Sequence, residues 1–455
     1  MKKHLLKTAV LLILISFTAA CTKKDDCPYV IEEKVVVVPP VNCVDSPFAG
    51  YMVVTFSEDI PSQSAMILNP NMTYNAPIGT DWFDPALGAL KLPQINTPQW
   101  SIANIGTVFG IALDNSNGIY LSASNIYAEN GFVAGVVGSP GGSAGIYYTN
   151  FLTPTITSTL VKTAASSSAN TVGTSTIPNT GTGLNSIGNI AFDKVNNQLF
   201  ATNLEDGRIY RINASTGVVL SIFDPFVIDN GIAGIAPAAE QLWGVGVLTS
   251  SGVTSVYFAK SYNNSSKEVW SVSLDSTGEF MATQIGSSKL FNDSASSSKL
   301  QIAYSSDSAC KITDIAFSSS GKILLAERGH AHRSKVFEFV KTGLIWGPAN
   351  NFFVGGNAVN AGQNCAGGVD YGNRKNNANN TVCDDVVWAS GNYMPFSIPG
   401  LFVYGLQGIK ASGNSSTVSN NQTTDLYIDY NHSYTTNDKG GIGDVEIVDS
   451  KCNCL

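Results

Sequence analysis

The chain has 455 residues, which suits one large domain or two ordinary ones and is too long for a small disulfide-stapled scaffold. Its net charge is −8, and its Lys and Arg residues form no cluster, which argues against binding to nucleic acid. Charged residues make up only 13% of the chain and Gly, Ser, Thr and Asn are plentiful, a composition typical of short strands joined by polar turns.

Residues 1–20 are predicted to be a secretory signal peptide. A basic start is followed by an apolar run from Ala9 to Phe17, which is too short to span a bilayer, and by small residues before Cys21. The ending "TAAC" resembles a bacterial lipoprotein signal, in which the cysteine is lipidated and becomes the mature N-terminus. Thr18 stands where such signals usually have Leu, so an ordinary signal followed by a chance cysteine is the alternative.

Residues 21–46 are predicted to be a lipid-anchored linker. "CTKKDD" resembles the export tag of surface lipoproteins in Bacteroidota-type bacteria, and a simple charged tether is the alternative. The resemblance implies acyl chains such as palmitate on Cys21, an outer-membrane location and exposure at the cell surface. A periplasm-facing protein is the other possibility. In either case the membrane contact is expected through the anchor alone.

Seven cysteines remain if Cys21 carries lipid, and an oxidising compartment favours disulfides among them. The odd number leaves at least one cysteine free or paired between chains. No pair has the C-x-x-C spacing of a zinc site. The seven are Cys27, Cys43, Cys310, Cys365, Cys383, Cys452 and Cys454.

Residues 47–455 repeat one plan: an apolar strand, a polar turn, a second strand with alternating apolar residues, and a polar loop. The clearest copies are at 109–124, 188–203 and 313–328, with weaker ones at 233–246, 367–390 and 407–430, the last continuing into 443–449. Such units suggest an all-β fold, a β-propeller whose sheets close in a ring, with six blades expected and seven as an alternative. A pair of β-sandwiches and a β-solenoid are the other architectures considered.

The repeats resemble NHL-type and gluconolactonase-like propellers in style. The stretches "GNIAFDKVNNQLFATN", "DIAFSSSGKILLAERGHAHRSKVFEF" and "GGVDYGN" are more closely similar to secreted bacterial propeller proteins over about residues 180–450. This resemblance implies a fold and not an activity. Gluconolactonase-like members hold a central cation with carboxylates and amides, so the resemblance implies Asn189, Asp314 and Glu327 as candidates for such a site.

The start of each first strand and the end of each second strand meet at one edge, so the polar loops there share one face. We predict that this face binds ligand and that Asn189 and Asp314 lie near the central channel. The full set of candidates is Asn189, Asn203, Glu205, Asp206, Arg208, Asp314, Glu327, Arg328, His330, His332, Arg333, Tyr393 and His432.

The three histidines of the mature chain all fall in loops of this face. Three imidazoles could ligate Zn²⁺, and the carboxylates of Asp314 and Glu327 suit Ca²⁺. His-x-His on a loop is only weak evidence for a metal site, however. The alternative is that these residues have a structural role and hydrogen-bond neighbouring loops. Likewise, Glu327 is expected to be solvated or paired with Arg, with the metal site as the alternative.

The sequence therefore supports two hypotheses of function. The first is a non-catalytic surface module that binds or assembles with a protein, glycan or envelope partner. The second is a metal-dependent lactonase, hydrolase or lyase acting at the channel mouth. Neither a G-x-S-x-G nor an H-E-x-x-H motif is present in the sequence.

Overall fold

Runs of Val, Ile, Leu and aromatic residues without helical period form strands almost throughout the described chain. The computed structural model describes most residues between 48 and 448. Residues 1–47 and 449–455 lie outside the described part, as do several internal stretches. The longer of these are 57–62, 69–93, 128–140, 152–161, 178–186, 227–239, 282–297, 414–425 and 430–441.

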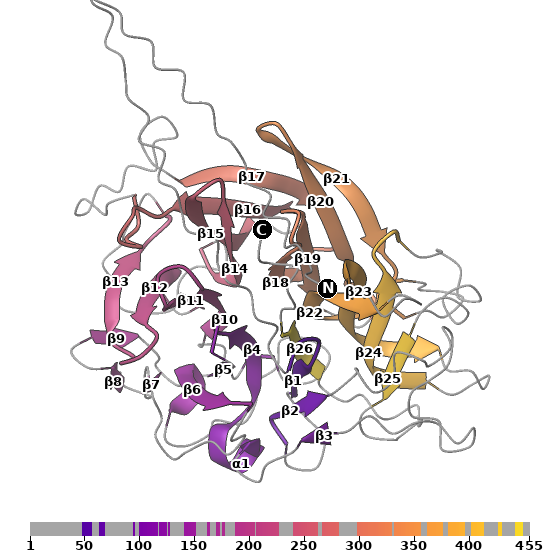
Figure 1. Ribbon diagram of the computed structural model, residues 1–455, viewed down its shortest axis with the longest axis horizontal. Coiled ribbons are helices and arrows are strands. Elements are labelled where there is room, and N and C mark those ends of the chain that lie inside the picture. The colour runs from indigo at the N-terminus through magenta and orange to yellow at the C-terminus, as the bar shows by residue number, and fades with distance from the viewer. Residues whose placement is uncertain are drawn as a thin grey trace, which may run out of the picture. The chain divides into compact units, whose positions relative to one another are not determined.

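The described strands form six four-stranded antiparallel sheets, the blades, which stand in a ring (Figure 1). From the innermost strand outward, blade 1 contains β26 (Ile442–Ile447), β1 (Met52–Phe56), β2 (Ala65–Leu68) and β3 (Gln94–Ile95). Blade 2 contains β4 (Val108–Leu113), β5 (Gly118–Ala123), β6 (Gly145–Asn150) and β7 (Lys162–Thr163). Blade 3 contains β10 (Ile187–Asp193), β11 (Gln198–Asn203), β12 (Arg208–Asn213) and β13 (Val219–Phe223).

The other three blades have the same order. Blade 4 contains β14 (Leu242–Ser250), β15 (Val253–Tyr262), β16 (Ser266–Ser273) and β17 (Ser298–Ser305). Blade 5 contains β18 (Lys311–Phe317), β19 (Ile323–Arg328), β20 (Val336–Thr342) and β21 (Ile345–Phe352). Blade 6 contains β22 (Cys365–Lys375), β23 (Thr381–Pro395), β24 (Phe402–Lys410) and β25 (Leu426–Asp429). Outside the blades are α1 (Ile102–Ile105), a 3₁₀ turn (Gly142–Ala144) and the hairpin of β8 (Asn170–Val172) and β9 (Ser175–Ile177).

The six-bladed propeller predicted from the repeats is confirmed, with changes in the assignment of two repeats. In the repeat at 233–246, residues 242–246 belong to the inner strand β14 and not to a second strand. Residues 407–410 do not open a blade, because they belong to β24, the third strand of blade 6. The inner strand of the remaining blade is β26, which pairs with β1 from the other end of the described chain (Val54 opposite Val445). The ring is thus closed by strands from both ends of the domain, which local sequence repeats alone do not reveal.

Apolar side chains fill the space between neighbouring blades rather than a single central core. One buried cluster joins blades 6 and 1 and includes Trp388, Leu406 and Val445, and another joins blades 2 and 3 and includes Tyr120, Ile190 and Leu199. Each sheet is therefore covered on both sides only because the ring is complete.

The ring has two distinct faces. We call the face where the inner strands begin the loop face; it also carries the loops from second to third strands. The opposite face, with the tight turns between first and second and between third and fourth strands, is the turn face. The described chain begins at the turn face, because Gly50 donates a backbone hydrogen bond to Val448, just past the end of β26 (2.9 Å).

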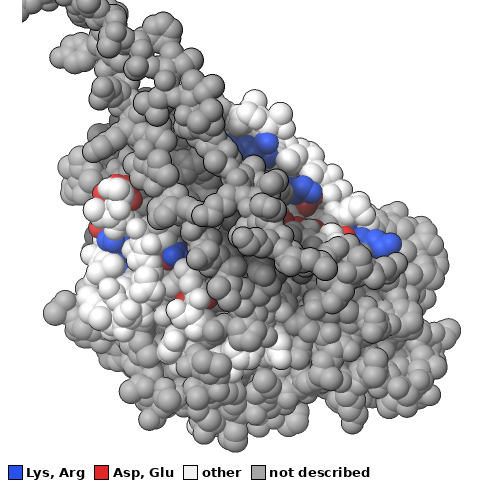
Figure 2. All heavy atoms as spheres, in the orientation of Figure 1, with Lys and Arg blue, Asp and Glu red and all other residues white. Residues whose placement is uncertain are grey.

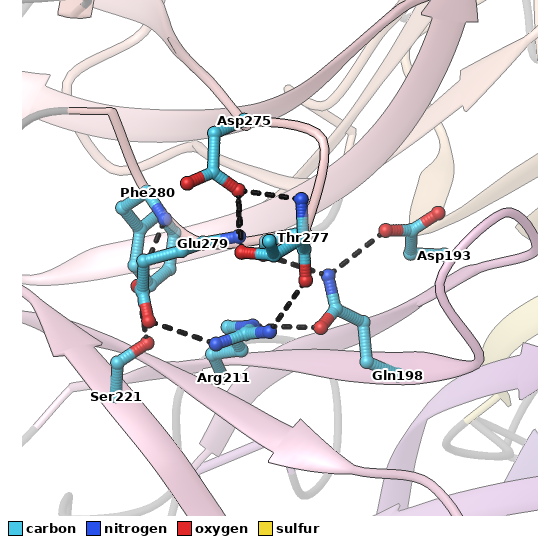
Figure 3. Close-up of polar contacts among 9 residues, drawn as sticks. Asp193, Gln198, Arg211, Ser221, Asp275, Thr277, Glu279 and Phe280 are labelled. Atoms are coloured by element: carbon cyan, nitrogen blue, oxygen red, sulfur yellow. Dashed lines mark hydrogen bonds and ion pairs between the residues drawn. The ribbon is translucent and has the colours of Figure 1, made fainter.

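Polar contacts join blades 3 and 4 at the turn face (Figure 3). The Arg211 guanidinium donates to the Glu279 carboxylate (2.8 Å) and to the Gln198 side-chain oxygen (2.7 Å). Ser221 donates to the other Glu279 oxygen (2.6 Å), so a strand pair of blade 3 holds the β16–β17 side of blade 4.

None of the helices in the described residues combines the length and the apolar character needed to cross a membrane. On the face shown in Figure 2, the described Lys and Arg side chains lie in small separate groups.

Candidate functional site

The central channel is lined by a ring of six equivalent residues, one from each inner strand. In every blade the pairing of the inner strand with its neighbour shifts register at this point, which marks a β-bulge. Bulges re-aim side chains and are frequent beside functional sites. Around the ring the residues alternate between glycine and a polar side chain: Gly110, Asn189, Gly244, Asp314, Gly368 and Asp444.

The glycines are required because the next blade approaches closely. A Cβ atom on Gly368 would lie 2.5 Å from the Cα atom of Asp444, and one on Gly244 would lie 2.9 Å from the backbone nitrogen of Asp314. Such distances leave no room for a side chain, so only three of the six positions can carry one.

The aspartates of the channel link neighbouring blades through one repeated arrangement. Asp314 accepts hydrogen bonds from the backbone nitrogen of Ile315 in its own strand (2.8 Å) and from that of Val369 in blade 6 (2.8 Å). Asp444 does the same with its own next residue (2.9 Å) and with Ile111 in blade 2 (3.1 Å). The carboxylates therefore have a structural role whatever else they bind.

The three polar side chains of this ring contact one another across the channel. The Asn189 amide donates to the Asp314 carboxylate (3.1 Å) and to the Thr313 carbonyl (3.0 Å). The carboxyl groups of Asp314 and Asp444 are hydrogen-bonded to each other. Burial, followed by the neighbouring acids, raises the pKa of Asp444 well above its usual range, while burial raises that of Asp314 to about 6. Both buried carboxyls therefore hold their protons more tightly than an exposed aspartate does.

A second pair of acids lies further along the channel. Asp370 repeats the linking arrangement, accepting from Tyr371 (2.7 Å) and from Ile447 in blade 1 (2.8 Å). Burial and then Asp370 raise the pKa of Glu446, and the nearby Lys194 ammonium opposes this shift. One oxygen each of Asp314, Asp444 and Glu446 lie within 4.8 Å of one another. Oxygen ligands at such spacing suit Ca²⁺ or Mg²⁺ rather than Zn²⁺.

Arg328 and Tyr127 fill the channel mouth at the loop face. Arg328 is 3% exposed and donates to the carbonyls of Ala366 in blade 6 (2.5 Å) and Ile442 in blade 1 (2.6 Å). It also donates to the Tyr127 carbonyl beyond blade 2 (2.8 Å), and the Tyr127 hydroxyl donates to Gly188 in blade 3 (2.8 Å).

The Tyr127 ring stacks on Phe109 (3.9 Å between centroids) and meets Trp243 of blade 4 edge-on (6.1 Å). Two side chains thereby bind all six blades together. Arg328, predicted as a loop residue of a binding face, is a buried plug.

Glu327 does not pair with Asp314, although its backbone lies on the neighbouring strand. Its carboxylate accepts hydrogen bonds from Ser306 (2.5 Å) and Tyr304 (3.2 Å) of the blade 4 side and from the Lys335 backbone (3.2 Å). Glu327 and Arg328 are consecutive in a strand and so point in opposite directions. Glu327 is 0% exposed, so the expectation that it is solvated is wrong. The alternative, a carboxylate pair with Asp314, is formed by Asp444 instead.

The candidates in blade 3 form a local cluster at the rim of the loop face. Asn203 is buried at the end of β11. Asp206 accepts a hydrogen bond from Tyr210 (2.5 Å), and Arg208 pairs with Asp224 (3.3 Å). These contacts brace one blade and do not reach the channel acids. Glu205 lies outside the described residues, as do His330 and His432.

His332 and Tyr393 meet at the seam of blades 5 and 6 on the loop face. The His332 ring hydrogen-bonds the Asn364 side chain through Nδ1 and lies edge-on to the Tyr393 ring (5.2 Å between centroids). Beside them Asn392 is buried, and its amide oxygen accepts no hydrogen bond from the described residues. Arg333 is exposed and pairs with Asp307 (3.3 Å).

Both residues of this pair have left-handed backbone conformations, with φ of 66° at His332 and 53° at Tyr393. Such values are uncommon outside glycine and cost on the order of 1–3 kcal/mol. The other three described non-glycine residues with positive φ are Asn197, Ser251 and Asp384, polar residues of the kind that turns tolerate. Strain of this kind concentrates at binding sites and switch regions.

Cys310 and Cys365 are free thiols, both buried at the starts of inner strands. The general expectation of disulfides therefore does not extend to these two. Burial raises the pKa of Cys310 to about 11 and that of Cys365 to about 12, so both are unreactive thiols at neutral pH.

Sequence reasoning found Asn189 and Asp314 but missed Asp370, Asp444 and Glu446. A signal was present, because "TDIAF", "GDVEI" and "GNIAF" align with a polar residue before Ile or Val. The repeat pattern predicts residues 443–449 as the continuation of the repeat at 407–430 rather than as an inner strand, which hides this equivalence.

No family model matches the chain, and no curated protein does. Solved β-propellers resemble it at low identity. A protein of unknown function from Bacteroides caccae is 10% identical with a TM-score of 0.35, over 80% of this chain and 91% of that one. A Bacteroides fragilis NCTC 9343 protein provisionally named a 6-phosphogluconolactonase is 10% identical with a TM-score of 0.37, over 89% and 99%.

The Dos1 propeller is 13% identical with a TM-score of 0.34, over 68% of this chain. This chain spans 60% of the length of that protein. These likenesses concern the fold and not an activity.

Proposed function

We propose that the protein is an exported lipoprotein, held in the outer membrane by acyl chains on Cys21 and exposed at the cell surface. Its propeller acts as a non-catalytic binding or assembly module for a protein, glycan or other envelope partner. The observation that carries this proposal is the pair His332 and Tyr393, held in strained conformations at the seam of two blades on the loop face.

The surroundings of this pair support a recognition site. Tyr393 lies in β23 of blade 6, and His332, in the loop between β19 and β20, is held against that blade by its hydrogen bond to Asn364. Tyr supplies contact area at low entropic cost, and the exposed Arg333 offers a donor beside it. A rigid platform with a small polar and aromatic contact set suits binding rather than chemistry.

The filled channel mouth supports the same conclusion. Arg328 and Tyr127 hold every blade at the loop face, so the mouth is a structural joint. A partner on this face would contact the loops around the joint and leave the channel acids covered.

Binding can be tested by replacing the strained residues with glycine, which tolerates positive φ. His332→Gly and Tyr393→Gly remove the rings without adding backbone strain, so the fold should keep or gain stability while the partner is lost. A benzophenone amino acid at position 333 would report the partner by photo-crosslinking on whole cells. We expect a discrete adduct that both glycine variants abolish.

Asn197→Gly is the matched control, because Asn197 also has a positive φ (52°) but lies in a turn of the opposite face. This variant should keep the adduct. An adduct that survives both loop-face variants, or that disappears in all three, would contradict the proposed site.

A second candidate function is a metal-dependent enzyme, favoured by the oxygens of Asp314, Asp444 and Glu446 gathered in the channel. These residues would hold Ca²⁺, which would supply a Lewis-acid centre, while the backbone hydrogen bonds to the two aspartates would fix their orientation. Metal analysis by mass spectrometry distinguishes the candidates. Stoichiometric calcium that is lost in Asp444→Asn but kept in His332→Ala would favour the enzyme.

A further inference from the structure

The described turn-face segments of blades 3, 4 and 5 carry exposed apolar side chains. All the large apolar residues that the described part of the chain leaves more than a third exposed belong to blades 3, 4 and 5. Each of them lies near the turn face, either in a turn or in the strand segment that adjoins a turn. Single exposed apolar residues are normal on a protein surface, but several at the same level of one face make a candidate contact surface for a membrane or a protein.

The tip of the β20–β21 hairpin is the most apolar point of this face. Leu344 is 90% exposed and Ile345 is 75% exposed at the turn between the two strands. This hairpin extends beyond the rim of the ring in Figure 1. Beneath the tip, the Lys341 ammonium lies over the Trp346 ring (5.9 Å to its centroid). Trp346 itself is buried in the cluster between blades 4 and 5, so it anchors the base of the hairpin. Two exposed aliphatic residues with a Lys ammonium just behind them match the order of groups at a membrane interface.

Further apolar residues share the level of the tip. Val195 and Val253 occupy turns of blades 3 and 4, and Met281 follows the turn after β16; they are 64%, 50% and 58% exposed. The polar clasp of Figure 3 fixes blade 4 to blade 3 beside Met281, so these side chains are displayed on a rigid surface.

The described chain also begins at this face. Gly50 is hydrogen-bonded to Val448 at the turn-face end of β26, and β1 runs from there toward the loop face. Residues 22–47 separate this point from Cys21. A fully extended linker of that length reaches roughly 90 Å, so the linker alone would not hold the propeller in a fixed orientation.

We infer that the turn face of blades 3–5 rests on the lipid bilayer that carries the anchor, with Leu344 and Ile345 inserted among the acyl chains. This inference rests on the proposed lipid anchor at Cys21. The anchor retains the protein, and the hairpin tip sets its orientation, which turns the loop face with His332 and Tyr393 away from the membrane.

The test uses the full chain, produced with its own signal and reconstituted in phosphatidylethanolamine and phosphatidylglycerol vesicles. A benzophenone amino acid replaces Leu344 in one protein and Arg333, which is exposed on the loop face, in another. Intact mass reports the acyl groups on Cys21, vesicle flotation reports anchoring, and irradiation reports covalent lipid adducts. We expect several-fold more lipid adduct from position 344 than from position 333, reduced by adding Ile345→Ser.

The outcomes separate the inference from the proposed anchor. An acylated protein that floats with vesicles but gives equal labelling at the two positions would overturn the membrane-facing orientation and leave the anchor standing. Adducts from position 344 to a second copy of the chain would overturn it in favour of self-association. A chain without acyl groups that does not float would overturn both.

Discussion

At the scale of single residues, the channel shows how a buried acid can have a structural role and still be able to bind a proton or a cation. Asp314, Asp370 and Asp444 each accept a backbone hydrogen bond from their own strand and another from the next blade. These hydrogen bonds between blades are by themselves a structural reason for burying the carboxyl groups. It also crowds acids together, so their protons are bound more tightly than in the unfolded chain.

This crowding predicts that the folded state loses stability as pH rises. Between the ordinary Asp pKa near 4 and the raised values, which reach about 8 for Asp370, the native protein holds protons that the unfolded chain has released. The free energy of unfolding therefore decreases across this range. We expect a lower melting temperature at pH 8.5 than at pH 5, and a smaller difference in Asp444→Asn, measured by scanning calorimetry.

Asp275→Asn provides the control, since Asp275 is an exposed turn residue whose pKa is lowered by hydrogen bonds from Thr277 and Glu279. It titrates below the range tested and should leave the pH dependence unchanged. Added calcium that restores stability at pH 8.5 in the parent chain but not in Asp444→Asn would indicate that a cation replaces the bound protons.

At the scale of elements, the six inner strands share a β-bulge and a position that is either glycine or polar. The repeats could be predicted from their apolar runs and turns, because the alternation that indicates a strand depends only on the residues of that strand. The direction of Arg328 could not be foreseen, since its partners are the carbonyls of Ala366 and Ile442, distant in sequence. Glu327 was misplaced for the same reason: its partners Ser306 and Tyr304 belong to the preceding blade.

The alternation of the ring predicts that its glycines resist substitution. In Gly368→Ala the new Cβ would meet the Asp444 backbone, which cannot move without disturbing β26. We expect a loss of about 2–4 kcal/mol in the free energy of unfolding by urea denaturation, as for other overpacked sites. Gly347→Ala, whose Cβ meets nothing within 4 Å, should change stability by about 0.5 kcal/mol or less. Equal effects of the two variants would refute the close-approach argument.

At the scale of the whole molecule, closure of the ring depends on one strand, β26. β26 lies between β1 and the inner strands of blades 2 and 6, and its residues Val445 and Ile447 belong to the cluster that joins blades 6 and 1. The number of blades was predictable from the sequence, but the partner of the last strand was not. Ring closure is a contact between residues nearly 400 positions apart, such as Thr55 and Asp444 (2.8 Å).

Removing that strand should therefore affect every blade. A chain that ends at residue 441 exposes the apolar sides of β1 and β22, and we expect it to lose cooperative thermal unfolding altogether. A chain that ends at residue 448 keeps β26 and should unfold in one transition, as measured by circular dichroism. A single sharp transition in the shorter chain would show that five blades hold without closure.

The position of β26 also sets the order of events during biogenesis. β26 follows every other described strand in the chain, so during translation the first blade lacks its innermost member until all the others have been made. A chain with a signal peptide is passed through a secretion pore in an unfolded form, and premature folding would block it. If the protein is exported as we propose, the late position of the closing strand would keep the ring open during transit and let it close after release.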